Sequence, residues 1–207
     1  MDAYQAVASS LNYALGMFHY PVVDDDTIRR SVGWGDRHLM GSFVKDEDID
    51  RVLSVYRQHH KNALKSGTKF LTGAKELLAQ LKQDNYLLTI ASNRPTRFTH
   101  IILKHLRASS LFDYVLCGDK VTNPKPAGDL LVETLKKFRL TPDEMIYVGD
   151  MTIDVQTGHA ANVKTIVIPT GSSTEQELKS LKPFCIIHRL DVLHDVLGEL
   201  NASPTKL

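Results

Sequence analysis

Five polar or charged residues of this 207-residue chain follow apolar segments, where they could bind a phosphate and a divalent cation. They are Ser92, Asn93, Lys125, Asp150 and Asp154. Carboxylates are hard oxygen ligands, and Mg²⁺ usually takes one or two from a protein, filling its other positions with water and phosphate oxygens. A hydroxyl, an amide and an ammonium group can bind the phosphate oxygens. The set therefore predicts phosphate chemistry assisted by Mg²⁺.

The second half of the chain predicts a sheet that would bring these residues together. Short apolar strands alternate there with helices, which is typical of an α/β fold whose parallel sheet is covered on both faces. Ligands of such sheets bind beyond the carboxyl ends of the strands. The strands are predicted at 86–92, 114–118, 145–150, 163–169 and 184–188, and the helices at 74–83, 96–106, 129–138, 154–161 and 191–200.

The spacing of the candidate residues suggests roles, and each role has a simpler alternative. Four residues separate Asp150 from Asp154, which places Asp154 about one helical turn further on the same side. Ser92 is expected to cap the following helix, whose free amides would form an anion site, and Lys125 would supply a point charge. Alternatively, the two acids only favour a helix start, Lys125 is a solvated loop residue between prolines, and Ser92 is an N-cap alone.

The first half of the chain predicts helices only. Apolar residues recur at helical spacing up to about residue 66, and Gly33 and Gly35 mark a bend within this half. We therefore expect a small all-helical domain at 3–68, an α/β domain at 69–200 and a disordered tail at 201–207. Trp34 lies within the bend and Arg37 and His38 follow it, where they would either face a substrate or serve packing and solvation.

The composition narrows the class of protein. With 25 basic and 24 acidic residues, the formal charge of +1 does not favour binding to nucleic acid or to an anionic membrane. The two cysteines lack the spacing of a zinc site or a disulfide framework, and no apolar run approaches the ~20 residues that cross a bilayer. We expect a cytoplasmic monomer or homodimer whose partner is a small molecule.

Three segments together resemble one known family. They are "TIASNRP" around Ser92, "NPKPAGDLL" around Lys125 and "YVGDMTIDVQTGHAANV" around Asp150 and Asp154. Their order and spacing are similar to the haloacid dehalogenase-like hydrolases, particularly the phosphoglycolate phosphatase-like branch. The resemblance implies a Rossmann-like core under a helical cap. Asn162 stands where relatives often have Gly, and we expect it to keep the left-handed turn that ends a helix.

The resemblance also implies an activity and roles for the candidate residues. The activity would be Mg²⁺-dependent hydrolysis of a small phosphorylated metabolite, such as phosphoglycolate, through an aspartyl-phosphate. Asp150 would ligate Mg²⁺, and Asp154 would support the metal or its water. Ser92 and the backbone amide of Asn93 would bind the phosphoryl group, and Lys125 would neutralise charge between that group and the nucleophile.

One family motif is missing from the chain. The family's first strand ends in Asp-Xaa-Asp-Gly-Thr, supplies the nucleophile, and lies between the strands that end here at Ser92 and Asp150. The chain begins with "MDAYQAV", which resembles the residues after that motif, so we expect an internal or truncated start. No strand precedes Asp2 to hold it as a nucleophile, and losing a nucleophile costs roughly four to six powers of ten in rate. The chain is therefore expected to be nearly inactive.

Two other functions stay open at this point. One is a catalytically dead module that keeps the phosphate pocket for binding or regulation. The other is a phosphomutase of the same superfamily, which would need an acid or base in the helical half aligned with a bound sugar phosphate.

Overall fold

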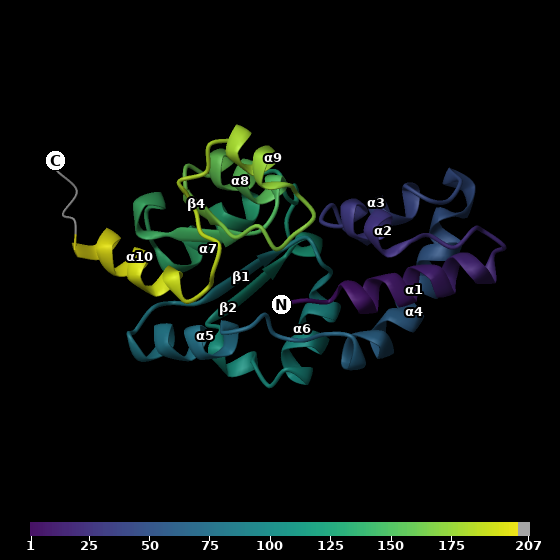
Figure 1. Ribbon diagram of the computed structural model, residues 1–207, viewed down its shortest axis with the longest axis horizontal. Helices are drawn as coiled ribbons and strands as arrows, with labels where there is room; N and C mark the ends of the chain where they lie inside the picture. The colour runs from purple at the N-terminus through teal and green to yellow at the C-terminus, as the bar shows by residue number, and fades with distance from the viewer. Residues whose placement is uncertain (203–207) are drawn as a thin grey trace.

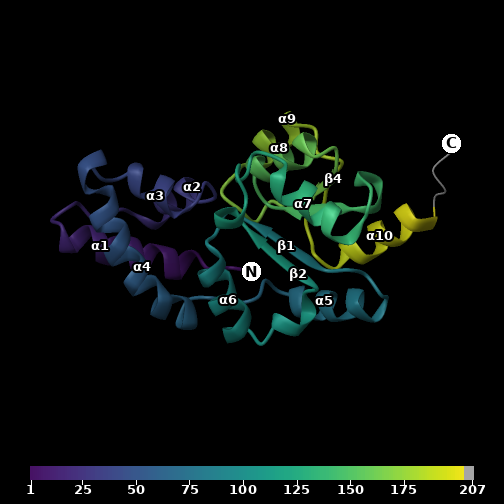
Figure 2. The ribbon, with the colours of Figure 1, turned by 180° about the vertical axis from the view of Figure 1, so that it is seen from behind.

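The computed structural model describes residues 1–202, with helices alone at one end and the strands at the other (Figure 1). The helical end comes first in the chain, and the same division is visible from behind (Figure 2). Short 3-10 turns connect several of the elements. The helices and strands are α1 (Tyr4–Met17), α2 (Asp25–Ser31), α3 (Asp36–Gly41), α4 (Ile49–Ser66), α5 (Ala74–Gln83), β1 (Thr89–Ser92), α6 (Thr96–His105), β2 (Tyr114–Cys117), α7 (Asp129–Phe138), β3 (Ile146–Gly149), α8 (Thr152–Ala160), β4 (Lys164–Val167), α9 (Glu175–Ser180), β5 (Cys185–Ile186) and α10 (Val192–Ala202).

The helical end has a hydrophobic core of its own. Apolar residues three or four positions apart put one stripe of each helix on its neighbour, as in Leu11 and Leu15 of α1 and Val52 and Tyr56 of α4. All of these side chains are buried, and their cluster draws only on residues of the first four helices and the loops between them. The helices at this end therefore hold one another in place without the sheet.

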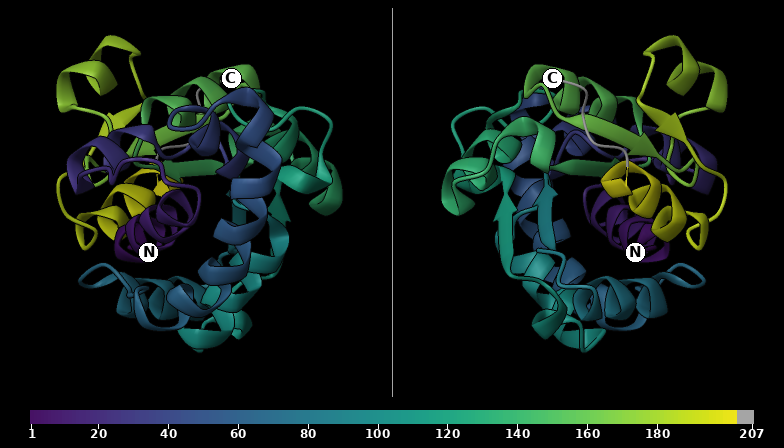
Figure 3. Two further views of the ribbon diagram at one scale, coloured as in Figure 1. Left: turned by 90° about the vertical axis from the view of Figure 1, so that its right-hand side faces the viewer. Right: turned by 90° about the vertical axis from the view of Figure 1, so that its left-hand side faces the viewer.

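The strand end confirms the α/β class but contains two separate sheets. β1 pairs with β2, while β3, β4 and β5 form the other sheet, and every pairing is parallel. Seen along the long axis, the two sheets lie at an angle to each other (Figure 3). β1 and β3 still share a hydrophobic cluster, since Ala91 of β1 packs against the cluster that contains Tyr147 of β3. Their carboxyl ends consequently meet at one edge.

The sequence predicts strands that are covered on both faces, but the coverage in the structure is incomplete. Val148 in β3 is 39% exposed, and all four residues of β1 are only half-buried. The physical reason is that, among residues 1–202, no strand pairs with the second edge of β1 or of β3. Apolar strand residues that a neighbouring strand would help to cover are left partly in solvent.

The two ends of the molecule are joined near the amino terminus. Ala3, Ala6 and Leu64 from the helical end pack against Phe98 and Ile102 of α6. Asp2 pairs with Lys69 in an isolated antiparallel bridge, with both backbone bonds at 2.9 Å. The amino terminus therefore lies beside β1 and α6 (Figures 1 and 2).

Most predicted elements are found, and a few predictions are wrong. Asn162 has the expected positive φ, 57°, after α8. The short helix α9 was not predicted. Asn201 and Ala202 belong to α10, so the tail does not begin at 201, and residues 203–207 lie outside the described part. The domain boundary at 68/69 stays a prediction. None of the helices within residues 1–202 is both long and apolar enough to cross a membrane.

Candidate active site

A pocket of about 240 Å³ lies where the helical end meets the carboxyl ends of β1 and β3. Four of the five candidate residues line it, namely Ser92, Asn93, Lys125 and Asp150. Asp154 is not among the lining residues. Residues of the helical end complete the wall, including the bend at Gly33 and Gly35. The structure therefore brings the phosphate-binding candidates and one of the two metal-binding candidates, Asp150, to one pocket.

The end of β1 presents the Ser92 hydroxyl to the pocket, but Ser92 does not cap the next helix. Its Oγ accepts a hydrogen bond from the backbone N–H of Arg94, 3.1 Å away. Helix α6 starts after Pro95 without a side-chain cap at that residue, and Asp119 instead accepts from the backbone and hydroxyl of Thr96. The expected N-cap role of Ser92 is thus wrong, because Pro95 sets the helix start too far along the chain.

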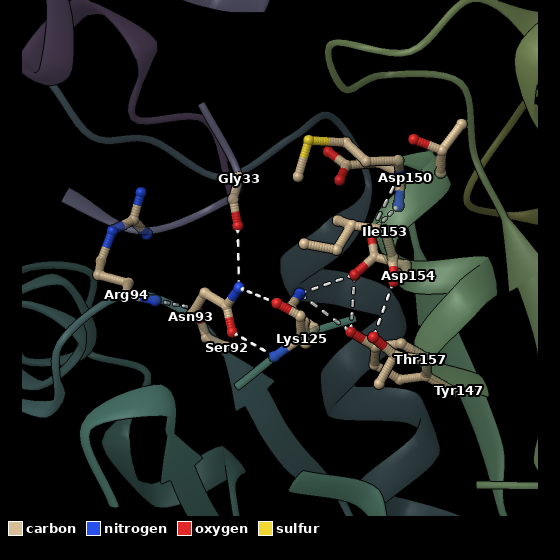
Figure 4. A network of polar contacts seen from close by, with 12 residues as sticks. Gly33, Ser92, Asn93, Arg94, Lys125, Tyr147, Asp150, Ile153, Asp154 and Thr157 are labelled. Atoms are coloured by element: carbon tan, nitrogen blue, oxygen red, sulfur yellow. Dashed lines mark hydrogen bonds and ion pairs between the residues drawn. The ribbon is translucent and has the colours of Figure 1, made fainter. Parts of the chain in front are cut away.

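The Asn93 side chain ties three segments together. Its Oδ1 accepts from the backbone N–H of Lys125 at 2.8 Å, and its Nδ2 donates to the Lys125 carbonyl at 3.0 Å and to the Gly33 carbonyl at 3.2 Å (Figure 4). The bond to Gly33 reaches into the helical end. Asn93 was predicted only as a phosphate-binding residue, and this bridging role of its side chain had no signal in the sequence.

Lys125 forms a buried polar cluster with Tyr147 and Asp154 (Figure 4). Lys125 Nζ lies 2.7 Å from Asp154 Oδ1 and 3.1 Å from the Tyr147 hydroxyl, which donates to the same Oδ1 at 2.8 Å. Burial alone would lower the pKa of Lys125, but Tyr147 and Asp154 hold it above its ordinary value. Lys125 therefore keeps its positive charge at the pocket wall. Tyr147, one polar side chain within an apolar strand, was missed.

Asp154 is fully engaged within the protein. Its Oδ2 accepts from the backbone N–H groups of Asp150 and Met151, both at 3.0 Å. Burial would raise the pKa of Asp154, but the Lys125 ammonium and these hydrogen bonds hold it below its usual range. A Cβ at Gly149 would lie 2.3 Å from the Asp154 Cβ, so only glycine permits this approach. Asp154 fixes the Asp150 backbone and Lys125 rather than facing a ligand.

We expect Lys125→Met to lower the free energy of unfolding by about 3–5 kcal/mol, because it leaves the Asp154 charge buried without its cation. The side chains of Lys125 and Asp154 are only 8% and 3% exposed. Urea unfolding at pH 7 measures the loss. Lys136→Met, which breaks an exposed pair with Glu133, is the matched control and should cost less than about 1 kcal/mol. Equal losses in the two variants would contradict the assignment.

Asp150 is the carboxylate that the pocket leaves available. Within residues 1–202 its side chain makes no hydrogen bond and no ion pair, although its own N–H binds Asp154. Burial, followed by the nearby Asp154 charge, raises the pKa of Asp150 to about 6. A half-buried carboxylate without a hydrogen-bonded partner would gain from a bound cation.

The residues around Asp150 fit a Mg²⁺ ion that keeps several waters, and they do not fit a metal ion held by several protein side chains. No group of three or more His, Cys, Asp or Glu side chains suited to a metal occurs in the described part of the chain. Mg²⁺ does not need one, since it keeps several waters and takes oxygens from a phosphate. Asp150 lines the same pocket as Lys125 and Ser92, the candidate residues for binding such a phosphate.

The helical end contributes mainly uncharged side chains to the pocket. Tyr4, Tyr56 and His60 line it, and Asp36, also in the wall, is bound by Arg57 through two bonds of 2.7 and 2.9 Å. Trp34, Arg37 and His38 line a separate shallow surface instead, and Arg37 pairs with Asp50. The structure does not bring these last three residues to the pocket that contains Ser92 and Asp150.

We expect His60 to make the protein less stable in mild acid. Burial, followed by the positive charge of Arg94, lowers the pKa of His60 to about 4, below the usual 6.5. The unfolded chain therefore binds this proton first, and the free energy of unfolding should fall by roughly 2 kcal/mol between pH 7 and pH 5 on account of His60. Urea unfolding at both pH values should show a smaller loss in His60→Gln. The control His105→Gln changes an exposed histidine and should lose as much stability between pH 7 and pH 5 as the unsubstituted chain. The same loss in His60→Gln would show that protonation of His60 is not its cause.

Comparisons with known proteins agree with this architecture. A curated phosphoglycolate phosphatase of Psychrobacter arcticus is 28% identical over 98% of this chain and 90% of its own length. An N-acetylmuramic acid 6-phosphate phosphatase of Pseudomonas putida is 28% identical over 73% of this chain and 70% of its own. The crystal structure of a predicted phosphatase from Clostridium acetobutylicum is 25% identical, with a TM-score of 0.85 over 96% of this chain and 93% of that one.

A further structure supports the fold, and a family pattern covers most of the sequence. A predicted phosphoglycolate phosphatase from Haemophilus somnus superimposes with a TM-score of 0.88 at 20% identity, over 94% of this chain and 92% of that one. The sequence pattern of the haloacid dehalogenase-like hydrolases matches residues 1–168, which include Ser92, Lys125, Asp150 and Asp154. The chain belongs to the haloacid dehalogenase-like hydrolase family.

Proposed function

We propose that this protein is a Mg²⁺-dependent phosphatase that hydrolyses a small phosphorylated metabolite similar to phosphoglycolate. By resemblance to its family and to curated phosphatases, the chain is a phosphoric monoester hydrolase. The observation that carries the finer proposal is the meeting of Ser92, Lys125 and Asp150 around one pocket. A hydroxyl, a buried ammonium group and an unpaired carboxylate are the donors that a phosphate and a dication need together.

Each residue has a proposed part in the reaction. The Ser92 hydroxyl and the Asn93 backbone amide bind oxygens of the phosphoryl group. Lys125 neutralises the charge that gathers there, and the Asp154–Tyr147 pair holds its ammonium in place. Asp150 would hold Mg²⁺, which supplies Lewis-acid polarisation of the phosphoryl oxygens when bound. Asp154 acts through Lys125 and the Asp150 backbone, since both of its oxygens are already hydrogen-bonded.

The helical end would serve as a cap, with the domains divided at residues 3–68 and 69–200. Gly33 already accepts a hydrogen bond from Asn93, so the bend reaches the phosphate side of the pocket. Closure of this bend over a bound substrate would exclude water and select the substrate. The expected cytoplasmic location suits such a metabolic enzyme.

The nucleophile is proposed to be an aspartate at the end of a strand between β1 and β3. The unpaired edges of these two strands and the exposed side chain of Val148 support that position. Asp2 does not suit the role, because it lies outside the pocket wall and its Oδ1 accepts from the N–H of Tyr4 at 3.1 Å. The 207-residue chain on its own is therefore proposed to be nearly inactive.

A phosphate-binding module without catalysis is the second candidate. This candidate is favoured because the pocket wall, within the described residues, offers no spare carboxylate as a nucleophile. Asp36 is bound by Arg57, and Asp150 is needed for the cation. A phosphomutase has less support, since the Nδ1 of His60, the histidine of the pocket wall, lies against Ser10 Oγ and the Ala6 carbonyl.

The test is phosphate release from a panel of phosphorylated metabolites by the chain extended at Met1 with an apolar strand that ends in Asp-Xaa-Asp-Gly-Thr. The phosphatase proposal expects release that requires Mg²⁺ and is fastest for small acids such as phosphoglycolate. Phosphate binding without any release, in a protein that the extension has stabilised, would favour the binding module.

A further inference from the structure

Arg94 is a charged residue of the pocket that the proposed chemistry does not use. It follows Ser92 and Asn93 at the end of β1 and lines the same pocket. Within residues 1–202 its guanidinium makes no ion pair and no hydrogen bond. Thr68 Oγ1 is the one fully enclosed side-chain polar atom there without a partner, so no nitrogen of Arg94 is fully enclosed.

No ion pair within residues 1–202 neutralises Arg94. Burial lowers its pKa. The groups that act on it most strongly by charge are Tyr56, Cys117 and Tyr4, which are neutral near pH 7, and the Asp150 carboxylate acts on it more weakly. Burial raises the pKa of Tyr4 to about 12 and lowers that of His60 to about 4, so neither side chain carries charge near pH 7. Asp36, the acid of the helical end that lines the pocket, is already held by Arg57. A half-buried guanidinium without a hydrogen-bonded partner would gain from a bound anion.

Arg94 also points away from the proposed phosphate donors. In the close view its side chain rises from the end of β1 toward the cap segment, whereas the Lys125, Tyr147 and Asp154 cluster lies on the other side of Asn93 (Figure 4). The pocket thus has two cationic positions, Lys125 and Arg94, separated by Ser92 and Asn93. A ligand that meets both needs an anionic group at each end.

We propose that Arg94 binds a carboxylate of the substrate, so that this pocket selects phosphomonoesters that carry one carboxylate a few atoms from the phosphate. This proposal rests on the proposed function, because it takes the phosphoryl group to lie at Lys125 and Asp150. Arginine matches a carboxylate with two parallel hydrogen bonds. A single positive charge balances a carboxylate, whereas a second phosphate dianion would leave excess negative charge in an enclosed pocket that already contains Asp150.

The test measures binding, so it needs no turnover and uses the 207-residue chain itself. Calorimetric titration in the presence of Mg²⁺ compares phosphoglycolate, ethyl phosphate, which lacks the carboxylate, and inorganic phosphate. A charged hydrogen-bonded pair of this kind predicts about 10- to 100-fold tighter binding of phosphoglycolate than of ethyl phosphate. Ethane-1,2-diol bisphosphate, which carries a second phosphate instead, should bind more weakly than phosphoglycolate.

Three variants separate this role from a structural one. Arg94→Met should bring the ratio of the two affinities to about one, and Arg94→Lys should keep part of the preference because the charge remains. Arg97→Met removes the same charge from an exposed neighbour outside the pocket and should keep the full preference. Binding of inorganic phosphate by each variant shows that the fold and the phosphate site are intact.

The outcomes distinguish this proposal from the one it rests on. If no form of the chain binds inorganic phosphate with Mg²⁺, both proposals fail. If phosphate binds but phosphoglycolate and ethyl phosphate bind equally, the proposed Mg²⁺-dependent phosphatase survives without its preference for phosphoglycolate-like acids, and the carboxylate assignment is overturned. A preference for the bisphosphate, or an undiminished preference in Arg94→Met, would overturn it as well.

Discussion

Fusing an apolar strand that ends in Asp-Xaa-Asp-Gly-Thr to Met1 is expected to raise Mg²⁺-dependent hydrolysis of p-nitrophenyl phosphate by roughly four to six powers of ten. The reason is that covalent catalysis needs a carboxylate fixed in line with phosphorus, and the described pocket holds no free one besides Asp150. Met1 lines the pocket, and its amino group lies near enough to Asp150 for the two charges to interact. An extension would therefore enter the space beside β1 directly.

The matched control is the same extension with its first Asp replaced by Asn. Both extended proteins should gain stability, since a buried five-residue strand contributes about 7–15 kcal/mol from its side chains before the cost of ordering it is subtracted. Only the Asp form should release p-nitrophenol. Robust hydrolysis by the 207-residue chain without any extension would show that the nucleophile lies elsewhere.

In the extended protein, Asp150→Asn is expected to lower Mg²⁺-dependent turnover by roughly two to four powers of ten while leaving the fold intact. Asparagine keeps the size of the side chain but removes the charge that would hold the dication, and metal stabilisation of phosphoryl transfer is worth several kcal/mol. Burial already disfavours the charged form of Asp150, whose pKa is raised to about 6. Removing that charge should leave the unfolding temperature unchanged or raise it.

Asp150→Asn should therefore lower turnover without lowering the unfolding temperature. If Asp150 had a purely structural role, both quantities would fall. Turnover measured across a Mg²⁺ titration, together with thermal unfolding, tests both parts. Asp143→Asn, an exposed acid in the turn before β3, is the control and should change neither quantity. Near-normal turnover in Asp150→Asn would remove the metal assignment.

The sequence predicted those elements whose signals are local. Helix α5 has the predicted bounds. Its apolar stripe is regular, and Gly73, directly before it, has a left-handed conformation that an α-helix cannot include. Helix α9 was missed although Thr174 and Glu177 form a capping box, since six residues are too few for a clear hydrophobic period. The strands were predicted too long, because many of the residues that flank them, such as Leu87 and Met145, are apolar too.

The candidate site was predicted less completely, since part of it depends on contacts between distant segments. The meeting of Ser92 and Asp150 could be predicted, because each ends or follows a predicted parallel strand and the carboxyl ends of such strands lie at one edge of the sheet. The spacing of Asp150 and Asp154 suggested that both face a ligand, but Asp154 turns to Lys125, 29 positions earlier in the chain. No local sequence pattern predicts the contact between Asp154 and Lys125 or the three hydrogen bonds of the Asn93 side chain.

The two open strand edges have a practical consequence for handling the 207-residue chain. Thr89–Ser92 and Ile146–Gly149 each leave one row of backbone N–H and C=O groups without a strand partner among residues 1–202. Neither segment contains a charge or a proline, the usual protection against intermolecular strand pairing. Concentrated samples should therefore be prone to aggregate through these edges, and a peptide that fills the space between them should also improve solubility.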